Sequence, residues 1–86
     1  MTLEEAFGEV LRDLRRLSGI SQEYLALECD LHRTYISQLE RGLKSPSIST
    51  IFKLAVTLKI TPHEIVLLTE DKLQDSSIRH LEASQK

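Results

Sequence analysis

The stretch SQEYLALECDLHRTYISQLERG, which runs from Ser21 to Gly42, decides the fold of this 86-residue chain. Its two halves each have the length of a short helix, and a tight turn around Asp30 separates them. Ser21 can accept a hydrogen bond from the first turn of the first helix, and Gly42 is a typical stop signal for the second. Aspartate tolerates left-handed backbone in a turn better than most non-glycine residues. The stretch therefore predicts helices at about 22–29 and 32–41.

The second of these helices has two different faces. At about 100° per residue, a set of polar residues falls within one arc of roughly 140°, and two aliphatic residues lie on the opposite side. The polar residues are Arg33, Thr34, Ser37, Gln38 and Arg41, the aliphatic ones are Ile36 and Leu39, and Tyr35 lies at the boundary. Arginine and glutamine can each form two hydrogen bonds with a base edge, and threonine can contact a thymine methyl group. A helix of this kind, after a short helix and a turn, is the arrangement that reads the DNA major groove.

The composition fits one modest globular domain. The chain is 41% hydrophobic and 28% charged, unlike a disordered protein. Its single cysteine, Cys29, cannot form an internal disulfide, which indicates a reducing compartment. No apolar run suggests a signal peptide or a membrane span. We therefore expect a cytoplasmic protein without membrane association.

The net charge of −2 counts against nucleic-acid binding if the total alone is considered. The distribution of charge matters more than the total. Arg33, Arg41 and Lys44 lie in or just after the two-faced helix, where only Glu40 opposes them. Such a basic strip can contact phosphates, while acidic residues elsewhere in the chain would discourage indiscriminate binding.

The rest of the chain predicts three more helices, at about 3–17, 48–58 and 62–68. Each begins with a threonine or serine that can cap it, and two of these have the glutamate three residues later that completes a capping box. The caps are Thr2, Ser47 and Thr61, and the glutamates are Glu5 and Glu64. Apolar residues recur at helical spacing in each helix. In the fourth helix the apolar stripe consists of Ile48, Ile51, Phe52, Ala55 and Leu58.

After Leu68 the chain becomes polar. We expect a helix-turn-helix domain at 1–69, with the motif itself at about 21–41. Residues 70–86 are expected to form a weakly structured tail with at most one short helix, around 77–82. Period-two strand patterns are missing from the sequence. The predicted fold class is therefore all-α, a compact bundle of five helices.

Residues spread over most of the chain match the pattern of the lambda-repressor-like, Xre-type helix-turn-helix family. They are Arg15, Gly19, Ser21-Gln22-Glu23, Leu25-Ala26, the run from Ile36 to Gly42, Ser45-Pro46 and Leu54-Ala55. The string RTYIS at 33–37 also resembles the small dimeric controller proteins of restriction–modification systems. The resemblance implies a transcriptional regulator, either a repressor or an autoregulatory controller, that binds a two-fold double-stranded DNA operator as a homodimer. It implies no cofactor, and no small-molecule ligand is evident.

Three residues depart from the family pattern, and all of them lie at helix ends. Asp30 stands where the family usually has glycine, so the turn is expected to be slightly strained. His32 occupies the cap position that serine or threonine normally fills, which predicts a poorer N-cap. Lys59 replaces the glycine common between the fourth and fifth helices. None of the three lies on the face that would read DNA.

The resemblance assigns DNA contacts residue by residue. The base-reading residues are expected to be Arg33, Thr34, Ser37 and Gln38, with Ser37 supporting its neighbours, and the phosphate contacts Gln22, Tyr35, Arg41 and Lys44. Tyr35 divides evenly between this role and core packing. The alternative for the other residues is an ordinary solvated helix face, which the sequence leaves open.

Two further positions are expected to serve structure. In the family, the residues at Arg15 and Glu40 form a partly buried ion pair that fixes the reading helix. Cys29 is expected to be an inert core thiol. The three histidines have no metal-ligand spacing, and no nucleophile motif or phosphate loop is present, so we do not expect an enzyme. The rival function is a protein-interaction module of the same fold, such as an antitoxin-like or adaptor domain.

The expected dimer interface follows from an excess of apolar residues. The run Ile65-Val66-Leu67-Leu68 spans more than one face of a helix. Leu67 or Leu68 should remain exposed near Val56 of the preceding helix, in a patch too apolar for a monomer. The alternative is that Ile78 and Leu81 of the tail fold back and cover this patch within one chain.

Overall fold

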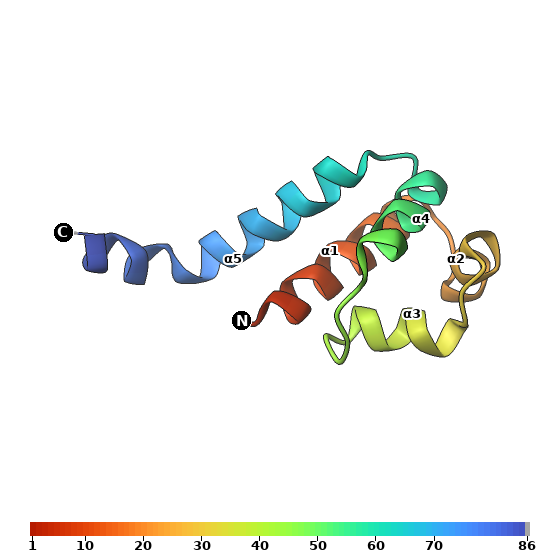
Figure 1. Ribbon diagram of the computed structural model, residues 1–86, viewed down its shortest axis with the longest axis horizontal. Coiled ribbons are helices and arrows are strands. Elements are labelled where there is room, and N and C mark those ends of the chain that lie inside the picture. The colour runs from red at the N-terminus through yellow and green to blue at the C-terminus, as the bar shows by residue number, and fades with distance from the viewer. Residues whose placement is uncertain (86) are drawn as a thin grey trace.

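The chain folds into five helices, and a computed structural model describes the backbone of residues 1–85 and the side chains of residues 1–74. The helices are α1 (Leu3–Leu17), α2 (Gln22–Cys29), α3 (Arg33–Glu40), α4 (Ile48–Leu58) and α5 (Pro62–Gln85). The helix-turn-helix pair α2 and α3 lies at one end, and α5 runs along α1 and projects beyond the other helices (Figure 1). The predicted all-α class is confirmed.

Local capping explains why the helices begin where the sequence predicts. The Thr2 hydroxyl accepts from the Glu5 amide at 3.0 Å, and the Glu5 carboxylate accepts from the Thr2 amide at 2.9 Å. Ser21 and Ser47 accept from the third residue of their helices in the same way. His32 precedes α3 without a side-chain capping bond, as expected for an imidazole in this position. These bonds satisfy amides that the helix itself leaves unpaired.

The departures from the family pattern at Asp30 and Lys59 both take the left-handed conformation. Their φ angles are 55° and 57°, and each residue ends a helix, α2 for Asp30 and α4 for Lys59. A non-glycine residue is strained in this region, and aspartate less so than most. The tight turn of the motif therefore forms without glycine at its left-handed position.

The apolar stripe predicted for α4 is only partly buried. Ile48 is 71% exposed and Phe52 is 58% exposed, whereas Leu54, Ala55 and Leu58 are buried. The α4 face that packs on the core is offset from the predicted one, with Leu54 in place of Ile48 and Phe52. Ile48 and Phe52 instead share a row with Val56, because residues four apart lie on one side of a helix.

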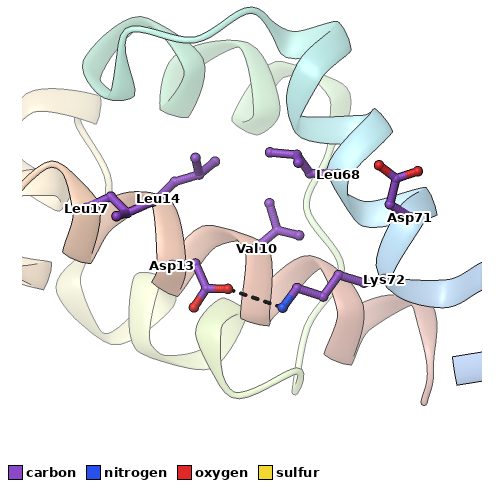
Figure 2. A pocket seen from close by; sticks show the side chains of 7 residues that line it. All are labelled: Val10, Asp13, Leu14, Leu17, Leu68, Asp71 and Lys72. Carbon is purple, nitrogen blue, oxygen red and sulfur yellow. Dashed lines mark hydrogen bonds and ion pairs between the residues drawn. The ribbon is translucent and has the colours of Figure 1, made fainter. Parts of the chain in front are cut away.

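The fifth helix is longer than predicted, and it continues from Pro62 to Gln85 instead of ending near Leu68. Contacts with α1 favour this extension. The Lys72 ammonium lies 3.4 Å from Glu9 Oε1 and 3.2 Å from Asp13 Oδ2, next to a hollow of about 360 Å³ between the two helices (Figure 2). The tail at residues 70–86 was predicted only from the polar composition of that segment. The sequence contains no glycine or proline after Pro62, so nothing local interrupts the helix.

The course of α5 also bears on the alternative in which the tail covers the apolar patch. The helix does not turn back toward α4, and its C-terminal end lies away from the other helices (Figure 1). The side chains of Ile78 and Leu81 lie outside the described residues. Among the described residues, no helix, including the 24-residue α5, is long and apolar enough to span a membrane.

Candidate nucleic-acid interface

Helix α3 presents the two faces that its sequence indicates. Ile36 and Leu39 have no exposed surface, and they anchor the helix in the core. On the other side Arg33 and Thr34 are exposed, while Ser37 and Gln38 are half-buried. The structure thus brings the four predicted base-reading residues together on one accessible surface, which we call the α3 outer face.

Basic residues continue this surface beyond the end of the helix. Arg41 ends α3 as its C-cap, and Lys44 follows in the loop before α4; both are exposed. Gly42 between them takes a φ of +73°, and its α-carbon lies so close to α1 that an added β-carbon would stand 2.9 Å from the Glu5 side chain. This glycine turns the chain sharply after α3, so Arg41 and Lys44 stay near the helix end.

Tyr35 and Gln22, both predicted to contact phosphates, also make contacts within the protein. Tyr35 is half-buried and packs against the hydrophobic core. Gln22 is the first residue of α2, and its amide Nε2 donates to Glu40 Oε1 at 3.0 Å. Both predicted phosphate contacts therefore come from side chains that are already partly fixed.

The predicted pair of Arg15 and Glu40 is present. Arg15 Nε donates to Glu40 Oε2 at 2.6 Å, and a second guanidinium nitrogen donates to Oε1 at 3.0 Å. The two side chains are only 13% and 3% exposed. Hydrogen bonding to Glu40 raises the pKa of Arg15 above its usual value. This two-point contact ties the C-terminal end of α3 to α1.

Sequence reasoning missed two other residues that hold α3 in place. Arg12, one turn before Arg15, donates to the Glu40 backbone carbonyl at 3.1 Å. Gly8 lets the helices cross closely, because an added β-carbon would stand 2.5 Å from the Leu39 carbonyl oxygen and 2.6 Å from that of Glu40. A glycine inside a helix costs about 1 kcal/mol relative to alanine, so Gly8 in the middle of an amphipathic helix was a readable signal.

Cys29 lies away from the α3 outer face, in the core between α2 and α4. Its thiol contacts the Thr57 hydroxyl at 3.4 Å and the Lys53 carbonyl at 3.5 Å. Burial raises the pKa of this thiol. A buried, protonated thiol is a poor nucleophile. Among the residues that the structure describes, no three His, Cys, Asp or Glu side chains are grouped to hold a metal ion.

The helices that form this surface match a known protein family. A family model described as helix-turn-helix matches residues 11–65, which include α2, α3 and α4. The chain belongs to the helix-turn-helix family. The matched region holds all the predicted DNA contacts, from Gln22 to Lys44.

Individual relatives of this helix-turn-helix protein include controller proteins. It is 45% identical over 64 residues to control protein C.BamHI from Bacillus amyloliquefaciens, covering 73% of this chain and 79% of that protein. It is 36% identical over 75 residues to control protein C.SmaI from Serratia marcescens, covering 87% of each. The solved structure of the restriction–modification controller protein C.AhdI from Aeromonas hydrophila matches with a TM-score of 0.70 and 44% identity, over 72% of this chain and 94% of that one. The predicted resemblance to controller proteins is confirmed.

Proposed function

We propose that this protein is a sequence-specific, double-stranded DNA-binding transcriptional regulator of the controller type. The observation that carries the proposal is the α3 outer face, a polar and basic surface on a helix whose opposite side is fully buried. An exposed helix held rigidly by buried residues can enter a major groove without deforming. The relatives named as control proteins support the same function. We place the activity in the cytoplasm, where such a regulator meets DNA.

The residue roles within the proposal follow from position along α3 and its flanks. Base edges are read by Arg33, Thr34 and Gln38, with Ser37 in support, and phosphates are held by Gln22, Tyr35, Arg41 and Lys44. Residues at the start and middle of a recognition helix reach base edges, whereas those at its end and in the next loop lie over the backbone. Base contacts give specificity, and phosphate contacts set the register.

We propose further that the protein acts as a dimer through an apolar patch on α4 and α5. We assign to this patch the exposed residues Val56, Leu67 and Leu68, and we add Ile48 and Phe52 of α4; Leu68 also lines the hollow between α1 and α5. Val56 is 80% exposed and Leu67 is 43% exposed, and α4 packs against α5. Apolar residues exposed together on two packed helices favour association with another protein surface. A second copy is the partner that would place two α3 helices about 34 Å apart, the spacing of successive major grooves.

A binding assay tests the proposed function. Labelled DNA from upstream of the protein's own gene is titrated in parallel with scrambled DNA of the same length and composition. We expect tight binding to the first and weak, strongly salt-dependent binding to the second. Equal affinity for both at all salt concentrations would favour the rival function, a protein-interaction module that does not read sequence.

A further inference from the structure

The carboxylate of Glu40 serves two helices at once. Glu40 is the last residue of α3, and its Oε2 accepts from Arg15 of α1. Its Oε1 accepts from Gln22, the first residue of α2, at 3.0 Å, in addition to a second bond from Arg15 at 3.0 Å. The Arg15 bonds explain how α3 is held to α1. The Gln22 bond joins a third helix, α2, to the same buried carboxylate.

Chemistry fixes which end of the Gln22 amide faces Glu40. An ionised carboxylate can only accept hydrogen bonds. The amide nitrogen of Gln22, and not its oxygen, must therefore be the atom that faces Glu40. One N–H is used in the contact with Glu40. The second N–H of the same nitrogen points in another direction and remains available as a donor. A phosphate oxygen is an acceptor, and a donor is what it requires.

We propose that Glu40 is a positioning residue for DNA binding, which orients the Gln22 amide so that its second N–H donates to a DNA phosphate. The inference rests on the proposed function, and it assigns Glu40 a role in the DNA contact in addition to its role in the fold. A long, flexible glutamine side chain loses rotamer freedom when it binds. Glu40 removes that freedom in advance, a preorganisation worth about two- to tenfold in affinity.

The arrangement also couples the two helices of the motif. Gln22 belongs to α2 and Glu40 to α3, and the contact between them joins the start of one helix to the end of the other. The phosphate held by Gln22 and the bases read by α3 are therefore kept in a fixed relation. A correctly seated α3 and a correctly oriented Gln22 depend on one carboxylate.

The test uses operator DNA in which single phosphates are replaced by neutral methylphosphonates, one position at a time. Wild-type protein should lose about tenfold or more in affinity at the phosphate that Gln22 contacts. Gln22→Met has nearly the same size but no amide, and it identifies this position because its own affinity should not change there. Glu40→Gln should lose most of the sensitivity at this same position. Arg15→Lys is the matched control, since it weakens the hold on α3, leaves Glu40 in place and should keep the full sensitivity.

If Glu40→Gln does not fold at the assay temperature, Glu40→Asp replaces it. This variant keeps the negative charge but shortens the side chain by one methylene group, which lengthens the contacts with both Arg15 and Gln22. Because Arg15→Lys controls for the weaker hold on α3, the variant should show the same loss of sensitivity at the Gln22 phosphate. Full sensitivity at the Gln22 phosphate in the Glu40 variant would overturn the inference, as would a Gln22→Met pattern identical to wild type. Failure of the wild-type protein to prefer any DNA would instead overturn the proposed function, and this inference with it.

Discussion

At the scale of single residues, Glu40 has the clearest energetic role. Its side chain is 3% exposed and carries a charge that is compensated by Arg15. Removing one partner of a buried ion pair leaves the other charge without compensation. Glu40→Ala should therefore lower the free energy of unfolding by about 3 kcal/mol, at the low end of the usual range because Arg15 keeps some access to water.

Urea unfolding followed by circular dichroism measures this loss. Glu28→Ala is a suitable control, because Glu28 is an exposed glutamate on α2 and its replacement should change stability by less than about 0.5 kcal/mol. An unchanged midpoint for Glu40→Ala, with only DNA affinity reduced, would show that Glu40 belongs to the interface and has no structural role.

The same residues show how far sequence reasoning reaches. The pair of Arg15 and Glu40 was predictable because both positions match the family pattern. The contacts of Gln22 and Arg12 with Glu40 were not, because they depend on how three helices cross in space. The roles of the α3 outer face and of its flanking residues in DNA binding remain predictions.

At the scale of helices, local chemistry predicted most boundaries. The capping residues Thr2, Ser21 and Ser47 define the starts of α1, α2 and α4, and the structure confirms them. Capping residues could not predict how far α5 extends. Its continuation past Leu68 is accompanied by contacts between Lys72 and α1, which the sequence alone does not show. The apolar stripe predicted for α4 does not coincide with its buried side, because apolar residues occupy two neighbouring rows of that helix and only packing decides between them.

Gly8→Ala tests the close crossing of α1 and α3. Alanine has the better helix propensity by about 1 kcal/mol, so an uncrowded site would gain stability. Here the added methyl group would overlap backbone carbonyls of α3 at 2.5 and 2.6 Å, which cannot move without shifting the helix. We expect a net loss of about 1–3 kcal/mol, measured as a lower thermal midpoint.

The control is Arg16→Ala, at an exposed position on the same helix. It should leave the free energy of unfolding within about 0.5 kcal/mol of the wild-type value, with little change in the thermal midpoint. A higher midpoint for Gly8→Ala would mean that α1 and α3 can separate at no cost, and the rigid support of the α3 outer face would have to be abandoned.

At the scale of the whole molecule, α1 is the common support. It packs against α3 through Gly8, Arg12 and Arg15, and against α5 through the bridge to Lys72. Helix α5 in turn carries part of the apolar patch proposed for dimerisation. The distance between two reading helices in a dimer would therefore depend on how α1 holds both of its neighbours.

Dimerisation can be tested by analytical ultracentrifugation at micromolar concentration. The wild-type chain should sediment as a dimer, and Val56→Glu should sediment as a monomer because it places a charge in the apolar patch. Leu27→Glu is the matched control, since Leu27 is 76% exposed on α2 and lies outside the patch. A monomeric wild-type chain would contradict the dimer and, with it, the two-fold operator.

The central claim is that the α3 outer face reads DNA sequence, and Arg33→Ala tests it most directly. Affinity is measured by fluorescence anisotropy for the protein's own operator, for every single-base variant of it and for random DNA. Lys44→Ala serves as the comparison, because a phosphate contact should weaken binding to all sequences alike and reduce the salt slope by about one. We predict that Arg33→Ala loses about 1–3 kcal/mol on the operator, loses its preference at one base pair per half-site, and changes little on random DNA. Equal losses on operator and random DNA would contradict the claim, because that pattern belongs to a phosphate contact.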